Sequence, residues 1–378
     1  MRTYGGALIK SNIKRQILTV LLSVGLSLCL SGCIPPDSGD PEYEAQVILV
    51  EGLPDGEKTI TLAELRVLTQ HKLNASFVRT TGLPEKYRME GPLLADIIAY
   101  LGGDLSDYEG IGVQGSDAYY CLIAEDIIES TDLMLAITID GKKKLEDGIA
   151  PARLAAQGQF GPYWVRMVDK ITLYKDIPEK NISSVWVFMN LVEGMEPYSY
   201  EYYGSKDDSY ELGMVFNRLE RVDIRSFFTM KSSDGFKKNE AISMVNERYY
   251  LKTEGDDAPT NISPFVKLGM NVKNIAWISM SDDACIFPEQ MMTYMPLNQI
   301  KGVLGLPLDE ILVETELRNL DTKQFELIGM KGESVTVGGL SLAKGILAPG
   351  ADGAWQVIWD DSLKLQGIDN LLRIRMVK

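Results

Sequence analysis

The sequence is poor in the residues on which most enzyme and metal chemistry depends. Its 378 residues include one histidine, His71, and four cysteines, Cys29, Cys33, Cys121 and Cys285. Zinc and haem sites usually need several such ligands, and histidine is the usual general base near neutral pH. The chain also has no C-x-x-C pair, no G-x-x-x-x-G-K-S/T phosphate loop and no G-x-S-x-G turn. The sequence therefore gives no support to zinc, haem, P-loop or serine-hydrolase chemistry, and no catalytic residue is assigned.

Positive charge is also scarce. The chain has 53 Asp and Glu residues against 38 Lys and Arg, which gives a formal net charge of −15 at pH 7. This excess disfavours binding to nucleic acid and flat binding to anionic lipid, because both of those surfaces are negative. We therefore expect no nucleic-acid partner.

Four adjacent acid pairs lack the D-x-D-x-D-G rhythm of a calcium loop. We interpret them as solvated loop charges and predict no metal site. The pairs are Asp207-Asp208, Asp256-Asp257, Asp282-Asp283 and Asp360-Asp361.

The N-terminal region has the pattern of a secretion signal. Four basic residues precede an apolar run, Ile17–Leu30, that is too short for a comfortable membrane span. Leu30-Ser31-Gly32-Cys33 then resembles the lipobox of bacterial lipoproteins. We predict a signal peptide over 1–32, lipidation of Cys33, and a location on the extracytoplasmic face of the cell membrane, with membrane lipid as a partner. An ordinary secretory signal or a short membrane anchor remains the alternative.

The next residues, 33–45, are rich in proline and acid and are predicted to form a tether. After signal removal and lipidation, Cys121 and Cys285 remain. They could pair in an oxidising compartment or lie buried as two small apolar side chains, and their spacing does not decide between these readings.

The chain resembles itself. Gly91–Ile98 aligns without gaps on Gly305–Leu312, each with a proline that we place in the first helical turn. Ile111–Gly115 matches Ile328–Gly332 further along, and Val168–Leu173 matches Leu371–Met376. These matches predict a domain that occurs at least twice.

A fainter middle copy aligns Thr229–Phe236 with Gly112–Tyr119, and its helix is reduced to Gly213–Leu219. The predicted copies span 46–176, 177–290 and 291–378, against the alternative of chance similarity among α+β segments.

Local signals in the first copy predict irregularly alternating strands and helices, which is typical of an α+β fold with mixed sheets and short helices. Thr61 followed by Glu64 is a capping box that opens a helix to about Thr69. The other predicted elements are helices over Pro92–Leu101 and Ala124–Ser130, and strands over Ile111–Gln114, Ala118–Ile123, Leu133–Ile139 and Trp164–Tyr174.

Five strings in the first copy, taken in order, resemble the sulfite-oxidase-type molybdopterin-binding oxidoreductase domain. The resemblance covers about 115 residues, and each string alone has low specificity. The strings are T-L-A-E-L-R-V-L (61–68), Y-R-M-E-G-P-L-L-A-D-I-I (87–98), G-S-D-A-Y (115–119), P-A-R-L (151–154) and Y-W-V-R-M-V-D-K-I (163–171).

The resemblance implies two cofactor contacts, and the chain departs from the family at one of them. Family enzymes hold molybdenum through a thiolate from a loop that corresponds here to Asn74–Gly82, with Arg79 about where the cysteine belongs. The arginine of P-A-R-L, Arg153, corresponds to one that contacts the pterin phosphate. The alternatives are that Arg153 pairs with a carboxylate of its own domain and that Arg79 is an ordinary surface arginine.

Tyr198, Tyr200 and Tyr202 alternate along a predicted strand, so their rings share one face. Such a row could stack on sugars or on a partner strand, or could be cross-strand packing.

Together these features predict a membrane-anchored lipoprotein with degenerate, repeated domains and a non-catalytic binding or scaffold role. Its expected partner is an envelope protein or redox partner. No cofactor is expected, and molybdopterin is implied by the resemblance alone. The alternatives are a molybdopterin-dependent oxidoreductase with altered metal ligation and a solute-binding lipoprotein.

Overall fold

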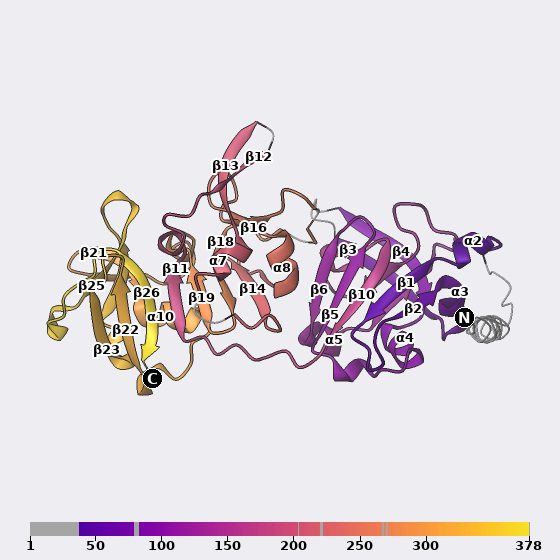
Figure 1. Ribbon diagram of the computed structural model, residues 1–378, viewed down its shortest axis with the longest axis horizontal. Coiled ribbons are helices and arrows are strands. Elements are labelled where there is room, and N and C mark those ends of the chain that lie inside the picture. The colour runs from indigo at the N-terminus through magenta and orange to yellow at the C-terminus, as the bar shows by residue number, and fades with distance from the viewer. Residues whose placement is uncertain are drawn as a thin grey trace, which may run out of the picture.

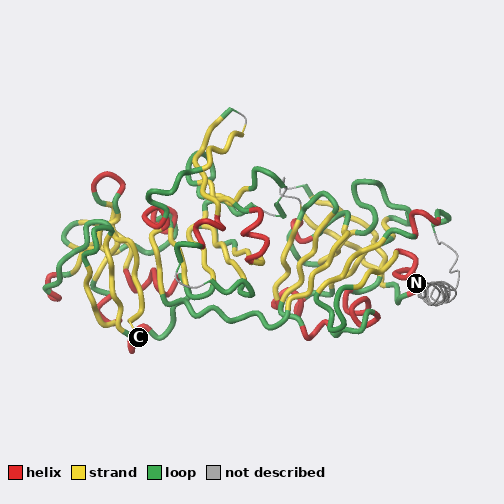
Figure 2. The backbone as a smooth tube through the Cα atoms, in the orientation of Figure 1, coloured by secondary structure: helices red, strands yellow, loops and turns green. Residues whose placement is uncertain are grey.

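The computed structural model describes residues 38–78, 83–202, 204–219, 222–266, 268–269 and 271–377. The predicted signal peptide, Cys33 and Arg79 lie outside these residues. Among the helices that are described, none has the length and apolar character needed to cross a bilayer. The described chain forms an elongated molecule with its early residues at one end and its C-terminus at the other (Figure 1, Figure 2).

The first segment, residues 41–174, is built on a five-stranded sheet in the order β2-β1-β10-β5-β6. Its first and last strands, β1 and β10, pair in parallel. Its helices are α2 (Pro41–Glu44), α3 (Leu62–Val67), α4 (Leu94–Tyr100), α5 (Glu125–Ser130) and the 3-10 turns η1 (Leu105–Asp107) and η2 (Gly161–Tyr163). Its strands are β1 (Val47–Glu51), β2 (Lys58–Thr61), β3 (His71–Val78), β4 (Pro84–Gly91), β5 (Gly110–Gly115), β6 (Tyr120–Ala124), β7 (Leu133–Ala136), β8 (Thr138–Ile139), β9 (Arg153–Ala156) and β10 (Val168–Tyr174).

The second segment, 184–280, and the third, 283–377, share one eight-stranded sheet, and β12–β13 projects from the body as a hairpin (Figure 1). The second contains β11 (Ser184–Val187), α6 (Phe188–Leu191), β12 (Tyr198–Tyr202), β13 (Ser205–Glu211), α7 (Leu212–Phe216), β14 (Phe227–Ser232), β15 (Lys237–Ala241), α8 (Ile242–Arg248), β16 (Tyr250–Lys252), β17 (Thr260–Ile262) and β18 (Ile275–Met280). The third contains β19 (Asp283–Ile286), α9 (Pro288–Met291), β20 (Asn298–Ile300), β21 (Val303–Pro307), α10 (Leu308–Glu314), η3 (Leu320–Thr322), β22 (Gln324–Gly329), β23 (Ser334–Gly338), α11 (Gly339–Leu342), β24 (Gly345–Pro349), η4 (Ala351–Gly353), β25 (Trp355–Trp359), η5 (Asp361–Leu363) and β26 (Leu371–Val377).

These mixed sheets and short helices make the protein an α+β fold, as the irregular alternation in the sequence predicted. In each segment a hairpin leads into a helix, a second hairpin leads into another helix, and a further strand pair precedes the last strand. The domain boundaries assigned from the sequence stay predictions.

The second and third segments exchange their first strands. The middle of the shared sheet runs β18-β19-β11-β26, with β11 and β19 parallel to each other. Strand β19 therefore pairs with the last strand of the second segment, and β11 pairs with the last strand of the third. Both of these pairings are antiparallel, in contrast to the parallel pair of β1 and β10.

This shared sheet separates two hydrophobic cores. Because side chains alternate along a strand, β11 contributes to both of them. Val185 and Val187 belong to the core of the third segment, whereas Trp186 belongs to the core of the second. Strand β19 divides in the same way, with Ile286 on one face and Cys285 on the other.

The same tight turn occurs once in each segment, between the two strands of its second hairpin. In each turn a backbone N–H donates a hydrogen bond to the carbonyl oxygen four residues later. The residue that donates this bond is also the one at which the strand's pairing with the last strand of the segment shifts register. The sequence alignment of Gly115 with Gly332 is therefore wrong by three residues, and Gly329 is the counterpart. The three bonds, each 2.8 Å, join Gly115 to Tyr119, Ser232 to Phe236 and Gly329 to Glu333.

Helices α4, α7 and α10 each begin with a fully buried leucine, Leu94, Leu212 and Leu308. Gly91 and Gly305, aligned from the sequence, both lie where a strand crosses a neighbour closely. A Cβ at Gly91 would approach the Leu135 carbonyl oxygen to 2.0 Å, and one at Gly305 would approach that of Leu347 to 2.6 Å.

The two prolines of the aligned motif lie before their helices rather than in the first turn. Pro92 precedes the N-cap residue of α4, Leu93, and Pro307 is itself the N-cap residue of α10. Gly213 lies inside α7, so it does not correspond to Gly91; chain position places Ser209 there.

Three other local expectations need correction. The region Asn74–Gly82, expected to be a loop, continues strand β3 as far as Val78 because it pairs along its length with β4. The strand expected over Leu133–Ile139 is divided between β7 and β8, which belong to different sheets. The last strand begins at Val168 rather than Trp164 because η2 and an extended loop precede it.

The end of the predicted tether is folded onto the first segment. Tyr43 is 4% exposed and joins the core, and its hydroxyl accepts a hydrogen bond from the Leu145 backbone N–H at 2.9 Å. Glu44 is buried beside Arg66, with Nε and Oε2 2.8 Å apart. The prediction of a tether is wrong for these two residues, because local composition does not show partners that are distant in the sequence.

Candidate functional site

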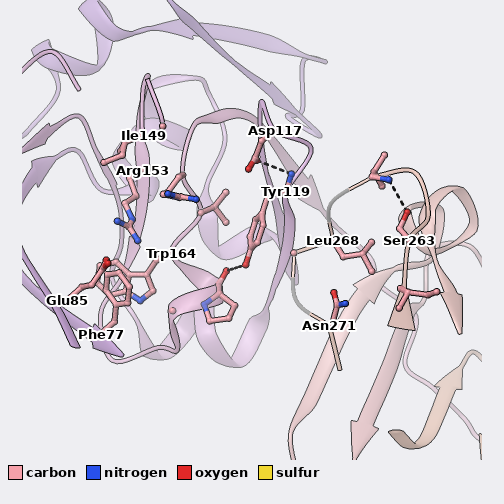
Figure 3. A pocket seen from close by; sticks show the side chains of 18 of the residues that line it. Phe77, Glu85, Asp117, Tyr119, Ile149, Arg153, Trp164, Ser263, Leu268 and Asn271 are labelled. Carbon is pink, nitrogen blue, oxygen red and sulfur yellow. Dashed lines mark hydrogen bonds between the residues drawn. The ribbon is translucent and has the colours of Figure 1, made fainter. Parts of the chain in front are cut away.

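A cavity of about 1120 Å³ lies between the first segment and a loop of the second, and it contains Arg153 (Figure 3). The first segment lines most of it, and the described residues of the loop 262–273 form the facing wall. From the first segment come Phe77, Glu85, Tyr87, Asp117, Tyr119, Glu146, Gly148, Ile149, Arg153, Gly161, Pro162, Trp164, Val165 and Arg166. From the second come Tyr200, Ile262, Ser263, Val266, Leu268, Gly269, Asn271 and Lys273.

Arg153 is the first residue of β9 and is only 5% exposed. Its guanidinium carbon lies 4.9 Å from the ring centre of Phe77 and 5.4 Å from that of Tyr87. Both distances are within the range of a cation–π contact, which stabilises a charge that is partly removed from water. The aromatic rings therefore hold the guanidinium in one orientation at the cavity wall.

The aromatic wall follows from strand alternation. Phe77 on β3 is two residues out of register with Tyr87 on β4, so both side chains lie on one face of the hairpin. Their ring centres are 6.2 Å apart, and Trp164 stacks on Phe77 at 4.6 Å. The Tyr87 hydroxyl donates to Glu85 Oε2 at 2.8 Å, and the indole N–H of Trp164 donates to the Gln159 carbonyl oxygen at 3.1 Å.

The facing wall depends on a close backbone contact. A Cβ at Gly269 would lie 1.4 Å from the carbonyl oxygen of Tyr120, so only glycine allows this approach. The contact presses the loop against β6 and places the Asn271 side chain opposite the aromatic wall (Figure 3). Lys273 ion-pairs with Asp257 at 2.6 Å at the exposed rim.

Charges of both signs line the cavity in equal number. The acids are Glu85, Asp117 and Glu146, and the bases are Arg153, Arg166 and Lys273. The cavity is thus close to neutral in a chain whose net charge is −15. Tyr119 stands between the two walls, and burial raises its pKa well above the ordinary range, so its hydroxyl stays protonated and donates to the Pro162 carbonyl oxygen at 2.8 Å.

The cavity arginine is specific to the first segment. In each segment the last strand shifts register at one residue, and a backbone N–H bonds to the carbonyl oxygen three positions before it. The N–H groups that donate these three bonds belong to Leu154, Asn261 and Val357. The residues that precede them are therefore equivalent, and they are Arg153, Thr260 and Gln356. The three-fold recurrence of structure does not extend to the cation.

The described residues do not match the donor set that a molybdenum cofactor needs in the family that the sequence resembles. The cavity lining contains no cysteine. Cys121 is buried, and burial raises the pKa of its thiol to about 12, which disfavours a thiolate. Within the described ranges, no group of three or more His, Cys, Asp or Glu side chains could hold a metal ion. We therefore derive no chemical step through such a group.

The other sequence candidates are dispersed. His71 lies at the start of β3, six positions before Phe77, where its Nε2 is 3.2 Å from Asp96 Oδ2, and it does not line the cavity. Cys121 and Cys285 are both buried and unbonded to each other, in the cores of the first and second segments. Burial raises the pKa of Cys285 as well.

The tyrosine row divides between two environments. Tyr198 packs against Tyr250, two strands away in the same sheet, with ring centres 5.3 Å apart, and both lie near Phe265. Tyr200 instead lines the cavity, which connects the projecting hairpin to the site.

Phe77, Tyr87 and Trp164 were not identified from the sequence. The alternation of Tyr87 and Met89 on a strand could have placed Tyr87 on a wall, but nothing local links it to Arg153, some 66 positions away.

A second missed feature lies against strands β14 and β18 of the shared sheet. The Lys180 ammonium donates to the hydroxyls of Thr229 and Ser279, and burial lowers its pKa to about 7. It contributes nothing to the cavity.

The chain matches no family model, and no curated protein matches it. Among solved structures it has a distant neighbour, the sulfane dehydrogenase SoxCD from Paracoccus pantotrophus, with 15% sequence identity and a TM-score of 0.33. The match covers 45% of this chain and 48% of that chain, so the chain spans about half the length of this neighbour. A similarity of this size supports no assignment of fold family or activity.

Proposed function

We propose that this chain is a non-catalytic binding protein of the cell envelope, anchored through Cys33, that holds an oxyanion-bearing ligand in the Arg153 cavity. The observation that carries the proposal is the placement of a buried arginine, stacked on two aromatic rings, in the wall of a cavity of about 1120 Å³. A guanidinium fork matches the geometry of carboxylate and phosphate oxygens.

The aromatic stack supports recognition by fixing the orientation of the fork. Rings on the face of a guanidinium leave its N–H groups directed in the plane, at right angles to the stack. Less side-chain freedom is lost when a ligand binds to a group that is already oriented. The lining includes neither histidine nor cysteine, the side chains that most often act as general base or nucleophile near pH 7.

Binding can be tested on residues 34–378 with a panel of oxyanions and small carboxylates, read by thermal unfolding. We expect one class to raise the melting temperature of the parent protein and not that of Arg153→Gln. Gln356→Ala, at the equivalent position of the third segment, is the matched control and should behave like the parent.

Metal analysis of the same protein tests the competing function. Stoichiometric molybdenum with pterin fluorescence in the purified protein would overturn the binding proposal in favour of an oxidoreductase with altered ligation.

The anchor requires its own test on the full chain. Labelled palmitate should be incorporated into the parent and not into Cys33→Ser, and the variant should leave the membrane fraction. Unchanged membrane association of Cys33→Ser without label would contradict lipidation.

A further inference from the structure

We infer that the ligand of the Arg153 cavity is an extended peptide segment that ends in a free carboxylate, bound between the aromatic wall and the loop 262–273. This inference rests on the function proposed above and names the chemical class of the ligand. Three features of the cavity support it: its charge balance, its apolar wall and its contact with an edge strand.

The charge balance favours a single carboxylate over a phosphate. Three acids and three bases line the cavity, and Glu85 lies beside Arg153 (Figure 3). A phosphate dianion would bring about two negative charges into a site with no net positive charge, and like charges within a few ångströms repel strongly at low dielectric. One carboxylate at Arg153 adds only one charge and matches the fork.

The cavity lining is suited to apolar side chains. Five aliphatic residues line it, and they come from both segments. Sugars present hydroxyl groups that need hydrogen-bonding partners when they are desolvated, so an aliphatic wall is a poor surface for them. Peptide side chains gain stability from the same contact. The residues are Ile149, Val165, Ile262, Val266 and Leu268.

The loop wall supplies polar partners for a backbone. Asn271 carries both a donor and an acceptor, and its side chain points into the space between the walls (Figure 3). A carboxamide of this kind can accept from one peptide N–H and donate to a carbonyl oxygen. The cavity volume, about 1120 Å³, is also above the range of about 300 to 1,000 Å³ typical of small-molecule pockets.

An edge strand contributes to the cavity lining. Tyr200 lines the cavity and lies on β12, the outermost strand of the sheet β12-β13-β16-β17. In the described part of the chain, β12 pairs only with β13, so its other edge presents backbone groups outward. An extended peptide that leaves the cavity past Tyr200 can add to this edge, a recognised mode of peptide capture.

The test compares two synthetic peptides on the protein without its signal peptide, residues 34–378, by titration calorimetry. The probe is Ala-Leu-Val-Leu with a free C-terminal carboxylate, and its partner is the same sequence with a C-terminal amide. We expect the acid to bind at least about tenfold more tightly, because a charge-assisted bidentate bond is lost in the amide.

Variants assign the two ends. Arg153→Gln should abolish the difference between acid and amide, whereas Arg153→Lys should keep part of it and verifies that the site still folds. Asn271→Ala should weaken both peptides by a similar factor and leave their ratio unchanged. Gln356→Ala should change neither affinity.

The outcomes separate this inference from the function on which it rests. If neither peptide binds but inorganic phosphate or an oligogalacturonate binds in an Arg153-dependent way, the peptide inference is wrong and the binding function stands. Equal affinity for acid and amide would also overturn the carboxylate assignment. If none of these probes binds in an Arg153-dependent way, both the inference and the proposed function fail.

Discussion

The first segment differs from the second and third in how its opening strand pairs. In the first, the opening strand β1 returns to its own last strand, β10, in parallel. In the other two, the opening strands are exchanged: β11 pairs with the last strand of the third segment and β19 with the last strand of the second. The first segment is thus complete by its own strands, whereas the other two depend on each other.

This difference explains where the cavity lies. The first segment meets the second through side chains and turns, not through a shared strand. Phe227 packs edge-on against Tyr174, and a Cβ at Gly110 would lie 2.5 Å from the Phe227 ring. Arg248 donates to the Ala118 carbonyl oxygen at 3.3 Å and to Gln114 at 3.2 Å. Such a junction leaves a cavity between the first and second segments. Between the second and third segments the sheet is continuous, and hydrophobic side chains pack on both of its faces.

A buried ion pair lies on the second segment's side of the same junction. Lys238 and Glu240 are 2% and 0% exposed, and Lys238 also donates to the Tyr249 hydroxyl at 3.3 Å. Burial and the Glu240 charge raise the pKa of Tyr249, so its hydroxyl stays protonated. Buried pairs of this kind fix geometry more than they add stability.

Truncation should break the comparison most completely. Residues 38–177 and residues 178–378 are each expected to unfold cooperatively, whereas 178–282 alone should not fold. Without β19 and β26, strand β11 has neither neighbour and an apolar edge is exposed. Circular dichroism melts and size-exclusion profiles measure this, and a monomeric 178–282 with a cooperative melt would refute the mutual dependence.

Equivalent leucine-to-alanine substitutions in the three segments test whether the second and third unfold as one unit. Leu94→Ala, Leu212→Ala and Leu308→Ala each remove a fully buried side chain and should cost about 2 to 5 kcal/mol. Leu94→Ala should lower one denaturant transition, and the other two should lower a second, common transition. The idea fails if Leu212→Ala and Leu308→Ala shift separate transitions in urea titrations followed by fluorescence.

The two parts should also respond to acid through different carboxylates. Burial raises the pKa of Glu314, but hydrogen bonds from Lys231, Tyr294 and Trp277 outweigh it and hold the pKa below the usual 4.5. Burial also raises the pKa of Glu44, but hydrogen bonds from Arg66 outweigh it and keep the pKa below its usual value.

A lowered folded pKa gives stability that is present above the unfolded value and is lost as pH falls through the folded value. Glu314→Gln should therefore cost about 1 to 3 kcal/mol at neutral pH. It should also flatten the acid dependence of the common transition alone, with Glu44→Gln as the reciprocal control. Urea midpoints across the acid range measure both, and equal effects on both transitions would be inconsistent with separate units.

Substitutions in the repeated turn should change stability least, and the sign should differ between the first segment and the other two. Ala118 has φ 62°, and its counterparts Gly235 and Gly332 have φ 91° and 84°. Ala118→Gly should stabilise the first transition by about 1 kcal/mol, because only glycine adopts this region without strain. Gly235→Ala and Gly332→Ala should destabilise the common transition by a similar amount. Thermal melts decide, and a loss of stability in Ala118→Gly would show that the turns are not equivalent.

Much of the local structure could be predicted from the sequence. The Thr61–Glu64 capping box forms as expected, because both partners lie within one turn of helix. Arg153 was a candidate through the family resemblance, and it does line a cavity of about 1120 Å³. Failures came where a partner was distant: β3 extends through a predicted loop because β4 pairs with it, and Tyr43 is buried by contacts with Leu145.

The sequence by itself determined the α+β class and the acidic, cysteine-poor character, because propensity, periodicity and charge are local or additive. Only the tertiary structure decided that β11 and β19 exchange places and that Phe77, Tyr87 and the loop 262–273 gather around Arg153. The physical reason is that these features depend on strand pairing and packing between residues many positions apart. Such contacts leave no pattern within a local window of sequence.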